Sequence, residues 1–249
     1  MQKDHFTAVS NNYRKYRPAY PKELFQYLSS LTPGHQRVWD CGTGSGQTAV
    51  PLTEFYDEVI ATDLSKGQLE NAQAHERVVY KLSAAEKAPL EDQSVDLVTS
   101  SQAAHWFVLE EFYSEVRRVL RPGGVIALWC YGLLSVNESV DRVVKQLHDD
   151  LLGPFWPKRT IEDHTYGSLW FPFEELPRSA FTMRAHWTLE QLKNYFRTWS
   201  AAHKYYEQHQ VDPLEVLTEP FLKAWGNPEE VKEVTWPIYM RHGRVLTDK

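Results

Sequence analysis

Residues 40 to 47 read DCGTGSGQ, a run with three glycines at alternate positions and an aspartate at its start. A glycine-rich turn lets a ligand come close to the backbone, although the same turn also serves as a tight connection that binds nothing. The glycines depart from the dinucleotide pattern GxGxxG, because Gln47 stands where the third glycine of that pattern falls. The carboxylate of Asp40 would repel a pyrophosphate and attract an α-ammonium or a sulfonium group. The run therefore favours a positively charged ligand, and an NAD-linked oxidoreductase is the less favoured alternative.

A second carboxylate follows the next apolar segment, EVIATD, which ends in Asp63. An acidic residue roughly 20 residues after such a loop is placed to bind a ribose, because one carboxylate can accept both diol hydrogens. Either acid alone could be an ordinary loop or capping residue. Asp40 and Asp63 together, after consecutive strands, favour a nucleoside that carries positive charge.

A histidine lies in the later phrase QAAHWF, after another apolar segment. His105 is a candidate general base, since an imidazole can take a proton from an acceptor hydroxyl near neutral pH. Trp106 beside it could contact the acceptor. The structural alternative is a histidine that hydrogen-bonds a loop carbonyl and packs in the interior.

The segment YRKYRPAYP near the amino terminus holds Tyr13, Tyr16 and Arg17. The guanidinium of Arg17 could bind a carboxylate in bidentate fashion, and the alternative is an arginine stacked on a tyrosine. The second half of the chain is rich in aromatic residues, which could wall an acceptor site or simply pack together. The candidates there are Trp156, Arg159, His164, Tyr166 and Trp199.

The elements that must position these residues alternate along the chain. Short apolar segments predict strands at 37–41, 58–63, 78–82, 94–100 and 125–132, with amphipathic helices between them. Buried apolar strands that alternate with helices predict a parallel, doubly wound α/β sheet over residues 36–132. The helix at 47–56 should be kinked by Pro51. Capping boxes are expected at Ser65–Gln68 and Thr188–Gln191, and later strands at 180–187 and 233–241.

Composition narrows the class of protein. The chain has 249 residues and a formal charge of −6, with no block or stripe of basic residues, which disfavours nucleic acid and anionic membranes as partners. No apolar run approaches the ~20 residues of a membrane span, so a cytoplasmic protein is expected. Cys41 and Cys130 lie in apolar segments and are read as small core residues, with neither a disulfide nor a metal site expected.

Five ordered motifs resemble the class I S-adenosylmethionine-dependent methyltransferases with a type 11 core. These motifs are VWDCGTGSG, ATDLS, SAAEKAPLEDQSVDLVTS, SQAAHWF and EVRRVLRPGGVIAL. The phrases YRKYRPAYP, QAAHWF and YFRTWSA further resemble a small-molecule branch that includes trans-aconitate methyltransferase-like proteins. The resemblance implies a Rossmann-like, seven-stranded mixed sheet whose last two strands form an antiparallel hairpin, with a helical and aromatic lid. One domain over residues 1–249 is expected, with a cofactor core at 36–132 and cap and acceptor-site elements at 1–35 and about 133–232.

Carried over residue by residue, the resemblance implies contacts to each part of S-adenosyl-L-methionine. The expected cofactor contacts are Asp40, Gly42, Thr43 and Gly44 at the methionine part, Asp63 and Leu64 at the ribose and adenine edge, Ala85 and Glu86 at the adenine, and Ser101 and Gln102 at the sulfonium. His105 is the expected catalytic residue, and Tyr13, Arg17, Trp106 and Trp156 the expected acceptor contacts. Two positions depart from the pattern, since Cys41 replaces a hydrophobic or other small residue and Ala84 replaces an aspartate found in many relatives.

The expected function is methylation of a small-molecule acceptor, with the oxygen of a carboxylate or hydroxyl favoured and S-adenosyl-L-homocysteine as the product. Holding the acceptor in line can supply on the order of 7 to 11 kcal/mol, so a base is optional. The alternatives are a catalytically silent cofactor-binding protein and a methyltransferase of protein or RNA. A monomer or homodimer is expected.

Overall fold

The computed structural model describes residues 16–157, 165–177 and 179–245. Tyr13, Arg159 and His164 lie outside these residues. The chain divides into two compact units. The sheet unit comprises Tyr20–Gly132, Arg159–Phe181 and Ile238–Lys249, and the helical unit comprises Met1–Ala19, Leu133–Lys158 and Thr182–Pro237. The expectation of one domain over the whole chain stays a prediction.

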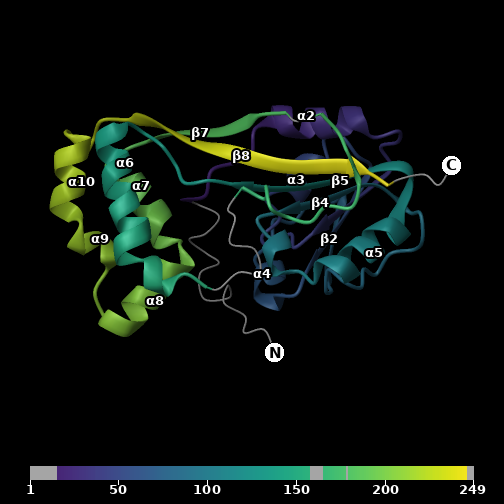
Figure 1. Cartoon of the computed structure of the whole chain (residues 1–249), viewed down its shortest axis with the longest axis horizontal. Helices are drawn as coiled ribbons and strands as arrows, with labels where there is room; N and C mark the ends of the chain where they lie inside the picture. Colours follow the sequence, from purple (N-terminus) through teal and green to yellow (C-terminus); the bar gives the residue numbers. More distant parts are fainter. Residues whose placement is uncertain (1–15, 158–164, 178, 246–249) are drawn as a thin grey trace. The chain divides into compact units, whose positions relative to one another are not determined.

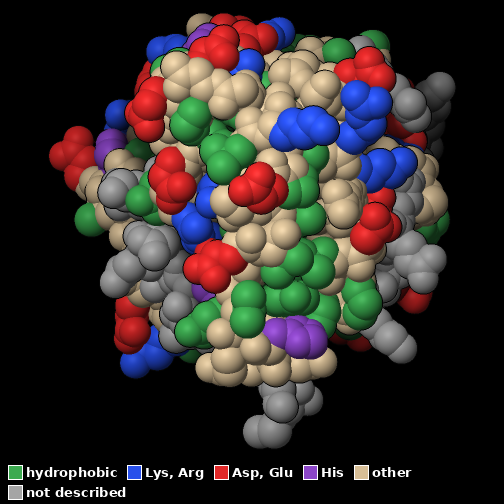
Figure 2. All heavy atoms as spheres, turned by 90° about the vertical axis from the view of Figure 1, so that its left-hand side faces the viewer, with side chains coloured by type: hydrophobic (Ala, Val, Ile, Leu, Met, Phe, Trp, Pro, Cys, Tyr) green, Lys and Arg blue, Asp and Glu red, His purple; other side chains and the backbone are tan. Residues whose placement is uncertain are grey.

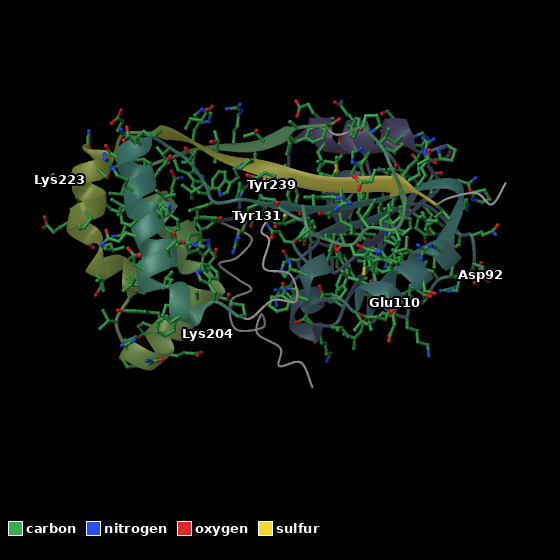
Figure 3. All side chains as sticks on the ribbon, in the orientation of Figure 1. Asp92, Glu110, Tyr131, Lys204, Lys223 and Tyr239 are labelled. Carbon is green, nitrogen blue, oxygen red and sulfur yellow. The ribbon has the colours of Figure 1, made fainter. Side chains whose placement is uncertain are left out.

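The sheet unit is built on five parallel strands. They are β1 (Arg37–Cys41), β2 (Glu58–Asp63), β3 (Val78–Leu82), β4 (Val95–Ser101) and β5 (Leu120–Tyr131). The sheet order is β3-β2-β1-β4-β5-β8-β6, and β8 (Lys232–Arg244) runs antiparallel to β5 (Figure 1). Figure 3 labels Tyr131 of β5, which pairs with Ile238 of β8, and Tyr239 of β8, which pairs with Cys130 of β5. The order and the antiparallel end confirm the predicted doubly wound α/β sheet.

The described residues contribute eight strands, one more than predicted. β7 (Phe181–Trp187) pairs with β8, as the predicted hairpin requires. The additional strand is β6 (Glu174–Glu175), which pairs antiparallel with the carboxyl end of β8. A two-residue strand has no hydrophobic periodicity, so nothing in the sequence could have indicated it.

Helices cover both faces of the sheet because every central strand is apolar on both sides. α5 (Leu109–Val119) buries Phe112, Tyr113, Val116 and Val119 in one core cluster with Trp39, Val98 and Ile126 of the strands. α2 (Lys22–Leu31) lies on the opposite face (Figure 1) and buries Leu24, Phe25 and Leu28.

The helices after β1 and β2 are shorter than predicted. The expected kinked helix at 47–56 is a single turn, α3 (Ala49–Leu52), followed by turns to Tyr56. Pro51 therefore does not bend a long helix; it lies in the first turn, where its missing N–H costs no helical hydrogen bond. α4 (Lys66–Glu70) ends at Asn71, whereas the sequence predicts a helix over the whole segment SKGQLENAQAHE, residues 65–76.

Asp96 binds several groups at the amino-terminal edge of the sheet. Its Oδ2 accepts hydrogen bonds from the backbone N–H groups of Gln36 and Arg37 at 2.8 and 2.9 Å, and both of its oxygens accept from Nη1 of Arg121. The side chain is 3% exposed. A buried carboxylate whose acceptors are used in this way joins β1, β4 and β5 where the strands begin.

The helical unit consists mainly of helices around an aromatic core. Its elements are α6 (Glu138–Lys145), the π-helical η3 (Gln146–Leu151), η4 (Gly153–Phe155), β7, α7 (Leu189–Arg197), α8 (Ser200–His209), α9 (Pro213–Val216), α10 (Thr218–Trp225) and the first part of β8. The predicted capping box at Thr188–Gln191 is complete at the start of α7. Figure 2 shows acidic and basic side chains interspersed on the face that these helices present. No helix among the described residues is long and apolar enough to cross a membrane.

Candidate functional site

Asp40 lies at the carboxyl end of β1 and is completely buried. Its Oδ2 accepts a hydrogen bond from the hydroxyl of Thr43 at 2.6 Å, and its Oδ1 accepts one from the hydroxyl of Thr99 at 2.8 Å. Burial is the main cause that raises the pKa of Asp40 to about 7, and these two hydrogen bonds oppose the shift. A carboxylate has about four acceptor positions, so Asp40 keeps capacity for a cationic donor.

The glycine loop has left-handed backbone at Gly42, Gly44 and Gly46. A Cβ at Gly42 would lie 2.5 Å from Cβ of Ala103, and one at Gly46 would lie 2.2 Å from the hydroxyl of Tyr80. A Cβ at Gly44 would meet only Oε1 of Gln68, at 4.0 Å. Two of the glycines therefore allow close packing inside the unit, whereas Gly44 leaves space above the backbone for a ligand.

Asp63 connects the glycine loop to the segment after β2. Its Oδ2 accepts from the backbone N–H of Gly44 and its Oδ1 from that of Ser65, both at 2.8 Å. The residue is partly exposed, and a carboxylate has about four acceptor positions in all. Asp63 therefore orders the glycine loop, and its binding of a ribose diol stays a prediction.

Two buried polar atoms beside the loop lack a hydrogen-bond partner among the described residues. They are Oγ of Ser45 and Oε1 of Gln68. The predicted capping box at Ser65 is only half formed: Oγ of Ser65 accepts from the N–H of Gln68 at 3.3 Å, but the N–H of Ser65 donates to Asp63. The side-chain oxygen Oε1 of Gln68 therefore does not accept from the N–H of Ser65. It lies 4.0 Å from the position that a Cβ would take on Gly44. Unsatisfied buried groups of this kind fit a ligand that completes their hydrogen bonds.

The predicted adenine contacts follow β2 and β3. Leu64 is 60% exposed, which is unusual for a leucine next to a buried strand, and Ala85 is buried. The carboxylate of Glu86 accepts a hydrogen bond from the backbone N–H of Val108 at 2.9 Å, at the start of α5. Glu86 thus joins the segment after β3 to the segment that carries His105.

The segment after β4 begins with Ser101 and Gln102. The hydroxyls of Ser101 and Thr48 lie 2.9 Å apart, so Ser101 joins β4 to the start of α3. Gln102 has a left-handed backbone (φ +55°), and its N–H donates to the carbonyl of Trp129 at 2.8 Å. A non-glycine residue with positive φ is uncommon and is often found at functional sites.

His105 lies in the 3-10 helix η2 (Ala104–Trp106) and is 4% exposed. Its Nδ1 is 3.1 Å from the hydroxyl of Tyr166, and its ring centroid is 5.0 Å from that of Trp106. The same segment packs against the glycine loop, because Ala103 and Phe107 are the nearest neighbours of the Cβ position of Gly42. His105 is therefore held near the loop in a hydrogen-bonded, interior position; its role as a base stays a prediction.

The predicted acceptor contacts that can be described in the helical unit form an aromatic cluster. The rings of His148, Trp156 and Trp199 have centroids 4.8 to 5.7 Å apart, and Arg17 lies 5.1 Å above the ring of Tyr195. The stacked geometry is the one expected of the structural alternative for Arg17. Binding of an acceptor by Arg17 and Trp156 stays a prediction, and Tyr13 lies outside the described residues.

Cys41 and Cys130 are both buried, and neither forms a disulfide. Within the part of the chain that the structure describes, no group of three histidine, cysteine or acidic side chains is arranged to hold a metal ion.

Comparison with known proteins identifies the family. Residues 39–128 match a family model described as a methyltransferase domain. A Dictyostelium discoideum protein whose name assigns it to the methyltransferases is 34% identical over 245 residues, covering 95% of this chain and 93% of its own length. CRG1 of Saccharomyces cerevisiae, named as an S-adenosylmethionine-dependent methyltransferase, is 29% identical and covers 77% of this chain and 78% of its own length.

A solved structure, described as a type II methyltransferase from Anaeromyxobacter dehalogenans, superposes with a TM-score of 0.87 at 39% identity. It covers 94% of this chain and 100% of its own. The chain belongs to the class I S-adenosylmethionine-dependent methyltransferases. The narrower resemblance to trans-aconitate methyltransferase-like proteins stays a prediction.

Proposed function

We propose that the protein transfers the methyl group of S-adenosyl-L-methionine to an oxygen of a small organic acceptor, a carboxylate or a hydroxyl. When bound, the cofactor supplies an electrophilic methyl group on a sulfonium. The chain's task is then to bind the cofactor, to hold the acceptor oxygen in line and to take its proton where there is one.

The residues of the sheet unit fit this cofactor by charge and hydrogen-bonding capacity. Asp40 offers a buried negative charge to the cationic methionine part, and Asp63 offers carboxylate oxygens to the ribose. Gly44 leaves space for close approach, and Gln68 offers an unsatisfied amide oxygen beside it. The exposed side chain of Leu64 suits the apolar face of an adenine.

The observation that carries the choice of oxygen as the acceptor atom is the position of His105. A buried imidazole with a fixed ring, in a segment packed against the glycine loop, is suited to receive the proton of a hydroxyl. A carboxylate acceptor would need no base, so the two acceptor classes differ in their expected dependence on His105.

The proposal of a small acceptor is supported by charge. The chain carries 27 basic and 33 acidic residues, and the described acidic and basic side chains on the face in Figure 2 are interspersed rather than gathered into a basic stripe. Binding to RNA depends on such a stripe. Cys41 and Cys130 are buried and form no disulfide, which suits a reducing, cytoplasmic location, and this location belongs to the same proposal.

The test is a screen of small carboxylic acids and phenols with methyl-labelled cofactor, scored for label in the product. His105→Gln should abolish transfer to phenols and largely preserve transfer to carboxylates. His242→Gln is the matched control, since His242 is also buried and bonded to a tyrosine hydroxyl, that of Tyr27, at 2.9 Å. Label found only in protein or RNA would contradict a small acceptor. Tight binding of S-adenosyl-L-homocysteine without any transfer would favour a silent binding protein.

A further inference from the structure

The residue that contacts His105 has an unusual conformation. Tyr166 is 1% exposed and has a left-handed backbone (φ +56°). Left-handed backbone is uncommon for a bulky side chain, and it persists only where the surroundings hold it. Tyr166 belongs to the core cluster on the α5 face of the sheet, with Leu169, Phe171 and Phe173.

Arg241 of β8 holds the turn that contains Tyr166. Its Nη1 donates to the carbonyl of Leu169 at 2.8 Å and to those of Tyr166 and Gly167 at 3.4 Å. Its Nη2 pairs with Glu175, and its guanidinium lies 5.1 Å from the ring centre of Phe171. One charged side chain therefore binds three carbonyl groups of this turn, which explains how the left-handed tyrosine is maintained.

The hydroxyl of Tyr166 meets one particular nitrogen of the imidazole, Nδ1, at 3.1 Å. In a neutral histidine one ring nitrogen carries the proton and the other accepts, and the partner of one nitrogen decides the state of the other. A histidine that is to take a proton through Nε2 must therefore carry its resting proton on Nδ1, where the tyrosine oxygen can accept it.

We propose that Tyr166, held by Arg241, is a positioning residue that keeps the proton of His105 on Nδ1 and so makes Nε2 the nitrogen that receives the acceptor's proton. The proton that leaves the acceptor hydroxyl is the one that Nε2 gains, and the Nδ1–H bond to Tyr166 remains intact in the resulting imidazolium. The tyrosine oxygen then stabilises the charge that develops on the ring. This inference rests on the proposed function, in which His105 is the base.

A second tyrosine–histidine pair in the sheet unit supplies the comparison. The hydroxyl of Tyr27 donates to the carbonyl of Pro177 at 3.0 Å and lies 2.9 Å from Nε2 of His242. Because the hydroxyl hydrogen is used by the carbonyl, this pair places the proton of His242 on Nε2, the opposite nitrogen. The two histidines are therefore expected to show opposite tautomers in one protein.

The experiment measures the ring-nitrogen signals of the histidines by 15N NMR in the full chain, without acceptor or cofactor, with His105 assigned by His105→Gln. The neutral form of His105 should carry its proton on Nδ1, and that of His242 on Nε2. Tyr166→Phe should move His105 toward the Nε2-protonated tautomer. Tyr113→Phe is the matched control, since it removes a buried hydroxyl from the same cluster that has no partner among the described residues; it should leave the signals of His105 unchanged.

Two results would overturn the proposal: a neutral His105 protonated on Nε2 in the unmodified protein, or signals of His105 that Tyr166→Phe leaves unchanged. The first result needs no variant of Tyr166, so a Tyr166→Phe protein that fails to fold does not prevent the test. Arg241→Gln should give a mixture of tautomers, because the turn loses its main constraint. With a hydroxyl acceptor, Tyr166→Phe should lower turnover by about 100-fold, the lower end of a general base's contribution, with an unchanged KM for the cofactor.

The outcome can be separated from that of the proposed function. Binding of S-adenosyl-L-homocysteine, measured by calorimetry on the same proteins, tests the methyltransferase site and should be equal in the unmodified protein and in Tyr166→Phe. Loss of binding in the unmodified protein would contradict the function, whereas an unexpected tautomer with intact binding would contradict only the role of Tyr166.

Discussion

Substitution of Gly44 by alanine should separate the cost of backbone strain from the cost of blocking the cofactor. The residue has φ +56°, so alanine there costs about 1–2 kcal/mol of stability. No clash adds to this cost, because the new Cβ would meet only Gln68, at 4.0 Å. In a chain of this size the melting temperature should fall by about 2–4 °C for each kcal/mol.

Gly44→Ala should also weaken cofactor binding, an effect that is separate from the loss of stability caused by backbone strain. The added methyl group would occupy the space through which a ligand approaches the loop, and overpacking of this kind costs about 1–3 kcal/mol. That range corresponds to about a 5- to 150-fold weaker affinity for S-adenosyl-L-homocysteine, which isothermal titration calorimetry would measure.

Gly123→Ala provides the matched control. Gly123 also has a positive φ (+77°), and a Cβ there would make an ordinary contact of 3.6 Å with Pro33. It lies in β5, near the edge of the sheet where the parallel strands begin, whereas Gly44 follows the end of β1. The two variants should lose similar stability, and only Gly44→Ala should lose affinity. Equal affinities in the two variants would refute the assignment of the space above Gly44 to the cofactor.

Three further substitutions have predicted outcomes: Asp40→Asn, Asp96→Ala and Thr188→Ala. Burial raises the pKa of Asp40 from 3.8 to about 7, so between these pH values the folded chain binds a proton that the unfolded chain has released. This contribution to the free energy of unfolding is lost as the pH rises from about 4 to about 7. Asp40→Asn should remove this pH dependence, measured by urea denaturation at several pH values. S-adenosyl-L-homocysteine should also bind more weakly at pH 6 than at pH 8, and this difference should be absent in Asp40→Asn. Asp96→Ala leaves Arg121 without its buried partner, so it should cost about 3–5 kcal/mol in the same assay without changing cofactor affinity; a loss below 1 kcal/mol would contradict the proposed role of Asp96. Thr188→Ala removes one half of a complete capping box and should cost about 1 kcal/mol, seen as a lower melting temperature; an unchanged melting temperature would count against the cap.

The central sheet could be predicted because its strands are continuous apolar runs. Four of the five parallel strands lie within one residue of the apolar run that predicted them, whereas β5 begins at Leu120, five residues before its predicted start. α5 lies where four apolar residues share a helical face. Local signals failed where competing hydrogen bonds decide the outcome. Ser65 and Gln68 have capping-box spacing, but the N–H of Ser65 is taken by Asp63, a choice that depends on the fold of the preceding strand end.

The site could be predicted in its residue types but not in its contacts. The charge and position of Asp40 are readable, whereas its partner Thr99 is 59 residues away in the sequence. Likewise, His105 could be named as a candidate base, but its bond to Tyr166 spans 61 residues. The spacing of residues along the chain predicts local structure such as helices and loops. It does not predict contacts between distant segments, which depend on sheet register and on how distant turns pack.

The buried polar groups at the two edges of the sheet suggest different purposes. Asp96, where the strands begin, accepts from two backbone N–H groups and from Arg121, so its oxygens are well satisfied. At the other edge, Gln68 keeps an amide oxygen without a partner among the described residues. Unpaired polar atoms also occur elsewhere in the core, so this absence alone identifies no site.

What distinguishes Gln68 is its position beside Gly44, the one glycine of the loop whose missing side chain leaves open space rather than room for a neighbouring side chain. A buried polar group without a hydrogen bond lowers the stability of the ligand-free protein, and a ligand that donates a hydrogen bond to the group raises that stability. Binding of S-adenosyl-L-homocysteine should therefore raise the melting temperature more in the unmodified protein than in Gln68→Leu, which has no group to satisfy. Equal increases would show that the amide of Gln68 takes no part in binding.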